Sequence, residues 1–172
     1  MAKTAAATVW RGTRRAAGAL VDGLFPHHCA LCVRLSRRTL ALCEECECSL
    51  TFNSNGCERC GLPDTPPGGS PCPACRGGFA FDRVLAPLSY DATLAALVAR
   101  WKYRRELALT ALFADLWLRH APSPDLPDRV LPMPLHWRRL CWRGFNQGER
   151  LATAIARGHP ALAGAPVDRR LL

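Results

Sequence analysis

The sequence has no long uninterrupted apolar run. None of its apolar stretches reaches the ~18 residues that a bilayer-spanning helix requires, so we expect no transmembrane segment. The first residues are basic but lack the apolar core of a secretory leader, because Asp22 interrupts the best candidate. We therefore expect no export signal and a cytoplasmic location, with a short amphipathic helix over residues 1–25 that ends at Pro26.

Acidic residues are also scarce. The 14 Asp and Glu residues face 23 Lys and Arg residues, which gives a formal net charge of +9. Such an excess favours anionic partners, either nucleic acid or phosphorylated small molecules, although a solvated arginine-rich surface would have the same composition. A hydrophobic fraction of 49% over 172 residues indicates a globular chain with one domain and room for a small appendage.

Cysteine, by contrast, is abundant. Nine of the ten cysteines lie within residues 29–75, and eight of these nine form four Cys-x-x-Cys pairs. A Cys-x-x-Cys turn aims two thiolates at one point, and two such turns supply the four soft ligands of a tetrahedral zinc ion. We expect sequential pairing, although an interleaved arrangement stays open. The expected ligand sets are Cys29, Cys32, Cys43 and Cys46 for one ion, and Cys57, Cys60, Cys72 and Cys75 for the other.

With four protein sulfurs each, these sites leave no position for water, so both zinc ions would be structural. A disulfide framework is the alternative interpretation, but it requires an oxidising compartment, and we expect no export. Redox Cys-x-x-Cys motifs usually occur singly. Cys48 is left without a role. We place a double zinc ribbon at residues 26–78.

Residues 79–172 show a different pattern of apolar residues. Alternation over residues 79–90 predicts one or two strands, and two amphipathic helical patterns follow. Asp91 is the expected N-cap of the first helix. Residues 129–135 resemble a buried strand that ends on prolines, and a last helix is expected from about Asn146, with Glu149 completing a capping box. The order strand, loop, helix predicts the opening of an α/β domain.

The loop before that last helix is the candidate binding site. A loop that follows a parallel strand and enters a helix N-terminus is where α/β folds hold anions, and Gly144 permits an unusual backbone conformation there. An arginine can donate two parallel hydrogen bonds to one phosphate group. The alternative is an ordinary loop with Phe145 packed on the core. The expected anion-binding residues are Lys102, Arg138, Arg139, Arg143, Gly144, Asn146 and Gln147. No catalytic residue is identified.

Three features in this order carry a family resemblance: the cysteine pairs, "YDATLAALVARWKY", and "LPMPLHWRRLCWRGFNQGERLA". Together they resemble the ComF family, whose members are associated with competence for DNA transformation. The resemblance implies a zinc ribbon joined to a type I phosphoribosyltransferase-like domain, a transferase fold with a parallel sheet. It also implies phosphoribosyl pyrophosphate bound with Mg²⁺, with residues 135–147 placed at the pyrophosphate.

The sequence departs from the family pattern in one respect. The resemblance implies a later strand with two acidic residues and a Thr-Thr-Gly turn that holds the ribose 5-phosphate, and no such motif occurs here. We expect residues 79–172 to be the N-terminal part of that domain, C-terminally incomplete, poorly stable alone and unable to transfer phosphoribosyl groups.

A second interpretation belongs to another class of protein. A zinc-ribbon module without catalytic activity would bind nucleic acid or a protein, with Trp137 and Trp142 as stacking platforms between arginines. The expected partners are phosphoribosyl pyrophosphate or another phosphorylated ligand, and single-stranded DNA or proteins of the competence machinery.

Overall fold

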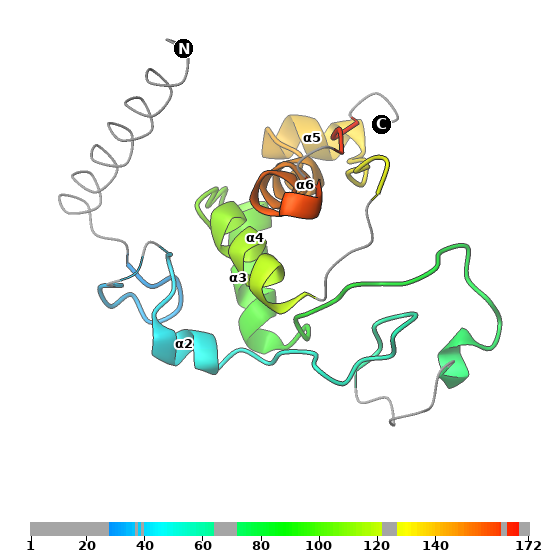
Figure 1. Ribbon diagram of the computed structural model, residues 1–172. Coiled ribbons are helices and arrows are strands. Elements are labelled where there is room, and N and C mark those ends of the chain that lie inside the picture. The colour runs from blue at the N-terminus through cyan, green and yellow to red at the C-terminus, as the bar shows by residue number, and fades with distance from the viewer. Residues whose placement is uncertain are drawn as a thin grey trace, which may run out of the picture. The chain divides into compact units, whose positions relative to one another are not determined.

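The computed structural model describes residues 28–36, 38, 40–63, 72–121, 127–162 and 165–168 (Figure 1). The chain divides into two compact units, residues 1–47 and 48–172. The helix expected at 1–25 lies outside the described residues. The described helices are α2 (Glu44–Cys48), α3 (Ala92–Tyr103), α4 (Leu109–His120), α5 (Trp137–Arg143) and α6 (Gln147–Gly158), with single 3-10 turns at Pro73–Cys75 and Pro160–Leu162.

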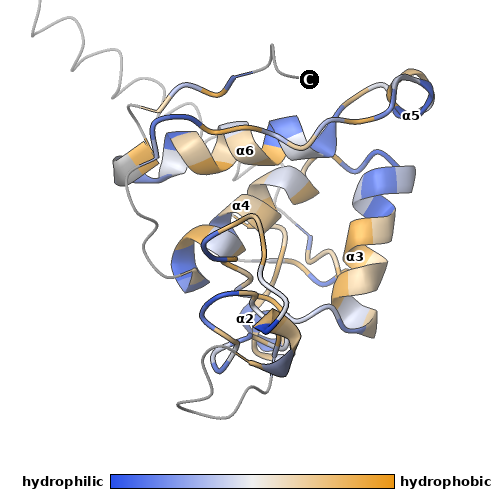
Figure 2. Cartoon of the chain, turned by 90° about the vertical axis from the view of Figure 1, so that its right-hand side faces the viewer, coloured by the Kyte–Doolittle hydropathy of each residue, from blue (hydrophilic) through white to orange (hydrophobic). Residues whose placement is uncertain are grey.

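The core of the second unit lies among α3, α4 and α6. The expected helical faces of α3 and α4 are confirmed, because their apolar side chains at helical spacing are buried. Trp101 packs against Phe113 with ring centroids 5.0 Å apart, and its indole N–H donates to the Thr110 hydroxyl at 3.0 Å. Figure 2 shows these apolar stretches along the middle of α3 and α4. None of the described helices is both long and apolar enough to cross a membrane.

Both expected N-caps are confirmed. The Asp91 carboxylate accepts from the Leu94 N–H at 2.8 Å, and the Asn146 side-chain oxygen accepts from the Gly148 and Glu149 N–H groups at 2.9 and 3.4 Å. A side-chain acceptor at this position satisfies amides that the helix itself leaves unpaired. The sequence therefore located the starts of α3 and α6 within one residue.

The expectation of a continuous loop over residues 135–147 was wrong. Residues Trp137–Arg143 form α5, which the His136 ring caps by accepting from the Arg138 N–H at 3.3 Å. The helix ends at Gly144, whose φ of 80° is left-handed and whose N–H donates to the Leu140 carbonyl at 2.7 Å. Glycine adopts this conformation without steric cost, and it is a common way for a helix to stop.

The strands expected over residues 79–90 and 129–135 were also wrong in extent, because only isolated bridges form within the described ranges. Phe52 pairs antiparallel with Leu88, and Val130 pairs parallel with Val167. Leu131 and Met133 are exposed, so the segment is not buried as expected. The Val130–Val167 bridge nevertheless pairs two segments in parallel, with α5 and α6 between them in the sequence.

The pairing of α6 with α4 includes one close approach. A Cβ at Gly158 would lie 2.5 Å from a methyl carbon of Leu118, so this position needs a residue without a side chain. The sequence also predicts Leu151, Ala152 and Ile155 as the buried face of α6, but these three are only half-buried, whereas Gln147 and Ala156 are buried.

Replacing Asp91 by alanine should lower the thermal unfolding midpoint at neutral pH, because the cap of α3 is lost. The Leu94 N–H and the Thr51 hydroxyl hold the pKa of Asp91 below its usual range. A folded-state pKa below the unfolded one stabilises the fold above the unfolded pKa, and this contribution disappears as the pH falls through the folded pKa.

The difference between wild type and Asp91→Ala should therefore shrink as the pH drops below about 4. Calorimetry across pH checks this, with Asp82→Ala as the matched change of an exposed carboxylate. A constant difference down to the acid limit would contradict the capping account.

Candidate metal centres and phosphate-binding cluster

Two groups of four cysteines come together in the structure. In each group the four sulfur atoms all lie within 4.8 Å of one another. The groups are the two sequential sets that the spacing predicts, and not an interleaved arrangement. The first set belongs to the unit of residues 1–47, and the second to the unit of residues 48–172. Four sulfurs at this separation fit the ligand shell of one tetrahedral zinc ion per set.

The first turn of each set has the same backbone design. The Cys29 N–H donates to the Arg34 carbonyl at 2.8 Å, and the Val33 N–H donates back to the Cys29 carbonyl at 2.9 Å. The equivalent bonds in the second set are Cys57 N–H to the Leu62 carbonyl at 2.9 Å and Gly61 N–H to the Cys57 carbonyl at 2.8 Å. Both turns place their fifth residue at positive φ, 63° for Val33 and 70° for Gly61.

Within each set the thiols differ widely in pKa. Amides of Cys60, Arg59 and Cys72 lower the pKa of Cys57 to about 6, whereas burial and hydrogen bonds from neighbouring thiols raise the pKa of Cys75 to about 12. In the first set, burial raises the pKa of Cys29, but backbone amides outweigh it and bring the pKa to about 6. Burial and the adjacent thiols raise the pKa of Cys46 to about 12.

Four thiolates this close repel one another, and a cation between them relieves that repulsion. Zn²⁺ supplies that charge and prefers thiolate ligands in this number. The donor chemistry thus fits the metal, and the closed coordination shell makes each site structural.

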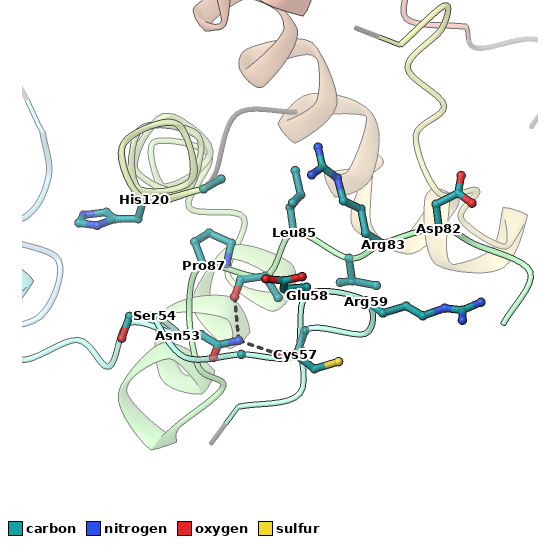
Figure 3. A pocket seen from close by; sticks show the side chains of 15 residues that line it. Asn53, Ser54, Cys57, Glu58, Arg59, Asp82, Arg83, Leu85, Pro87 and His120 are labelled. Carbon is teal, nitrogen blue, oxygen red and sulfur yellow. Dashed lines mark hydrogen bonds between the residues drawn. The ribbon is translucent and has the colours of Figure 1, made fainter. Parts of the chain in front are cut away.

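The second cysteine set is tied to the segment that leads into α3 (Figure 3). The Asn53 amide donates to the Gly61 carbonyl at 2.8 Å and to the Ala86 carbonyl at 3.1 Å, and the Asn53 N–H donates to the Pro87 carbonyl at 2.9 Å. The Thr51 hydroxyl donates a hydrogen bond to the Asp91 carboxylate at 2.9 Å. The zinc turn and the start of α3 are therefore parts of one hydrogen-bonded network.

A cluster of cations and aromatic rings joins the end of α3 to α5. It lines a cavity of about 260 Å³ formed by Lys102, Tyr103, Arg105, Trp142 and Arg143, which we call the α3–α5 cluster. The Arg105 guanidinium donates to the Trp142 carbonyl at 2.7 Å, and the Arg143 guanidinium lies 5.1 Å from the Tyr103 ring centroid. Arg143 is buried, and its Nε–H finds no acceptor among the described residues.

The structure brings only some of the expected anion-binding residues together. Lys102 and Arg143 share the cluster, whereas Arg138 and Arg139 are exposed on α5 and do not line its cavity. Asn146 is already used as a cap, and its amide also donates to the Met133 carbonyl at 3.1 Å. Because that cap occupies two amides at the start of α6, the helix N-terminus is less open to an anion than the sequence suggested.

The remaining two expected residues behave differently. Gly144 is needed for its φ and not for close approach, since nothing described lies within 4 Å of where its Cβ would be. Gln147 is buried, and its side-chain nitrogen has no partner among the described residues.

Sequence reasoning missed two contributors to this region. Arg105 reaches the cluster through a positive φ of 57°, which no sequence pattern reveals. Gly148, and not Gly144, is the glycine of close approach, because a Cβ there would lie 3.2 Å from the Met133 carbonyl oxygen. The missed signal for Gly148 is its place in the first turn of α6, where glycine is otherwise unfavourable.

Comparisons with known proteins agree with this structure. Residues 20–76 match the model of the double zinc ribbon domain family. The DNA utilization protein YhgH of Salmonella typhimurium is 31% identical over 135 residues, which are 74% of this chain and 53% of that protein. Its counterpart in Escherichia coli K12 is 29% identical over 136 residues, 75% of this chain and 53% of that protein. No solved structure matches the chain significantly.

The chain is thus a double zinc ribbon protein with a helical unit attached. The matches agree with the resemblance drawn from the sequence: the chain has a double zinc ribbon domain and is similar to the YhgH DNA utilization proteins. The chain spans about half the length of the curated relatives that it matches.

Metal analysis of the purified chain should find about two zinc ions per molecule. Cys60→Ser should remove one of them, since a hydroxyl is a poor zinc ligand, while Cys48→Ser and Cys141→Ser should leave both. Zinc stoichiometry measured by mass spectrometry under native conditions checks this, and a metal-free wild-type chain would contradict the assignment.

Because the two turns have the same backbone design, the residues at their fifth positions, Val33 and Gly61, can each be replaced by the other type. Val33→Gly should make zinc loss from the first site to a chelator slower, because a β-branched residue at left-handed φ costs about 1–2 kcal/mol. Gly61→Val should speed zinc loss from the second site, since its Cβ would also lie 3.2 Å from that of Ala86. Equal chelation rates in Val33→Gly and wild type would show that Val33 is not strained.

Proposed function

We propose that this chain binds the pyrophosphate group of phosphoribosyl pyrophosphate at the α3–α5 cluster and acts in the use or uptake of DNA in the cytoplasm. The observation that carries the proposal is the cluster itself. Three cations, Lys102, Arg105 and Arg143, line one cavity, and no carboxylate is among its described lining residues. Arginine and lysine side chains are the groups that proteins commonly use to bind phosphate oxygens.

Arg143 is the central residue of this proposal. Its guanidinium is buried under the Tyr103 ring, and its Nε–H has no partner among the described residues. A buried donor without an acceptor is costly, and a phosphate oxygen would satisfy it by a charge-assisted hydrogen bond. The cavity of about 260 Å³ has room for a pyrophosphate group.

The wider architecture supports a phosphoribosyltransferase-like domain. The parallel Val130–Val167 bridge, with α6 between its two segments, is the beginning of the β-α-β connectivity that such a domain needs. The curated relatives are named DNA utilization proteins, which is why we place the activity in the handling of DNA. Mg²⁺ would arrive with the pyrophosphate, since the described lining of the cavity offers no carboxylate to hold it.

In a phosphoribosyl transfer, the residues of the α3–α5 cluster would position and neutralise the leaving pyrophosphate. The charge that develops on the leaving oxygens would lie against guanidinium groups that are already positioned in the free protein. Arg143, fixed by the Tyr103 ring, would supply paired donors, and Lys102 would add a point charge.

Pyrophosphate titration of the purified chain, followed by calorimetry, tests this proposal. Arg143→Gln should weaken binding about tenfold or more, because it removes a charge-assisted donor from a buried position. Arg139→Gln is the matched control on the same helix and should bind like wild type. If Arg139→Gln and Arg143→Gln weaken binding equally, the anion is held by diffuse surface charge and the proposal is wrong.

A further inference from the structure

Residues 51–53 lie between the second cysteine set and the ends of two helices, and we call them the connecting segment. Phe52 pairs antiparallel with Leu88, which precedes α3. The Phe52 ring also stacks on the ring of His120, the last residue of α4, with centroids 3.9 Å apart and an interplanar angle of 26°. The connecting segment therefore contacts the approach to α3 and the end of α4 at the same time.

The side chain of Asn53 ties the connecting segment to the zinc turn (Figure 3). Its amide donates to the carbonyls of Gly61, at 2.8 Å, and of Ala86, at 3.1 Å. The turn also contacts the segment before α3 directly, because the Val84 N–H donates to the Arg59 carbonyl at 2.8 Å and a Cβ at Gly61 would lie 3.2 Å from that of Ala86. A displaced zinc turn would thus remove one acceptor from Asn53 and loosen the segment that leads into α3.

Helices α3 and α4 run from the connecting segment to the α3–α5 cluster. Helix α3 starts after Asp91, which accepts a hydrogen bond from the connecting segment, and its 12 residues extend for about 18 Å. Its far end carries Lys102 and Tyr103, which line the cavity. Helix α4 begins near that end, where the Trp101 indole N–H donates to the Thr110 hydroxyl at 3.0 Å. Both helices thus have one end at the connecting segment and the other beside the cluster.

The order of the zinc turn depends on the metal. The buried cluster around the second set consists of Cys57, Cys72 and Cys75, with Cys60 packed against it. Thiols this close repel one another once they ionise, and the energy of zinc binding is what folds a site of this kind. Without zinc, the turn has no fixed position for the connecting segment to bind.

We propose that zinc in the second cysteine set controls the α3–α5 cluster through the connecting segment. With zinc bound, α3 and α4 are held at one end and present the cations of the cluster in a fixed arrangement. Without zinc, that end loosens and pyrophosphate binds more weakly. The inference rests on the proposed pyrophosphate binding at the cluster and adds the regulation of that site. The first cysteine set, which lies in the other compact unit, provides the matched comparison.

Hydrogen exchange tests this coupling without any ligand. Cys60→Ser removes the second zinc and Cys32→Ser the first, which mass spectrometry under native conditions verifies. Amides of residues 97–103, at the cluster end of α3, should exchange at least about fivefold faster in Cys60→Ser than in Cys32→Ser, which is the lower limit of the usual coupling between sites. If only amides before Asp91 respond, the core among α3, α4 and α6 fixes the cluster by itself and the inference is wrong.

Pyrophosphate titration by calorimetry tests the consequence for binding. Cys60→Ser should bind at least about fivefold more weakly than Cys32→Ser. Asn53→Ala should keep both zinc ions and still lose affinity, because it removes the link and leaves the metal sites intact. Ser54→Ala, the same change at the exposed neighbouring residue, should bind like wild type. Zinc content is measured again after each titration, because pyrophosphate is itself a metal ligand.

The outcomes separate this inference from the proposed binding site. If wild type binds no pyrophosphate, the binding site is refuted and hydrogen exchange decides the coupling. If wild type binds and Asn53→Ala, with both zinc ions, binds equally well, the coupling is refuted and the binding site stands. If circular dichroism shows that Cys60→Ser does not fold, Asn53→Ala decides: faster exchange of residues 97–103 supports the coupling, and unchanged exchange refutes it.

Discussion

Four cysteine thiols within 4.8 Å of one another are the constraint on which this structure depends. Burial and the neighbouring thiols raise the pKa of Cys75 to about 12, whereas backbone amides lower the pKa of Cys57 to about 6. A divalent cation relieves the repulsion among the thiolates, and its binding energy becomes folding energy. Among the described residues before Phe79, Leu42 and Leu50 are the buried aliphatic side chains, so the ribbon has little other stabilisation.

The second metal site also determines how the helices begin. Asn53 donates hydrogen bonds to the carbonyl of Gly61 in the zinc turn and to the carbonyls of residues 86 and 87. The Thr51 hydroxyl donates to Asp91, the N-cap of α3. The other end of the same helix carries Lys102 and Tyr103 into the α3–α5 cluster. A structural metal thus supports a rigid element whose far end presents the charged residues, which is a common way to preorganise a binding site.

Sequence reasoning predicted the parts of this protein that local chemistry specifies. Cysteine spacing gave the two ligand sets, and Asp91 and Asn146 marked helix starts because their side chains satisfy nearby amides. It failed where long-range packing decides. The segment before Gly144 was taken for a loop, although seven residues without glycine or proline followed by a left-handed glycine are compatible with a short helix.

The candidate site was predicted in part for the same reason. Arg143 and Lys102 were identified by charge and position, but their meeting depends on the packing of α5 against the end of α3. Arg105, whose backbone has positive φ, joins them, and Arg138 and Arg139, equally basic in the sequence, lie outside the cavity. Charge in the sequence indicated an anion site, and only the fold selects which cations form it.

The most direct measurement is the nuclear magnetic resonance signal of the arginine Nε–H groups during titration with pyrophosphate. The account predicts that the Arg143 Nε–H, buried and without a described acceptor, shifts strongly and becomes protected from exchange with water, while that of Arg139 is unaffected. An Arg143 signal that stays in place while the exposed arginines shift would contradict the assignment of the α3–α5 cluster as the phosphate-binding site.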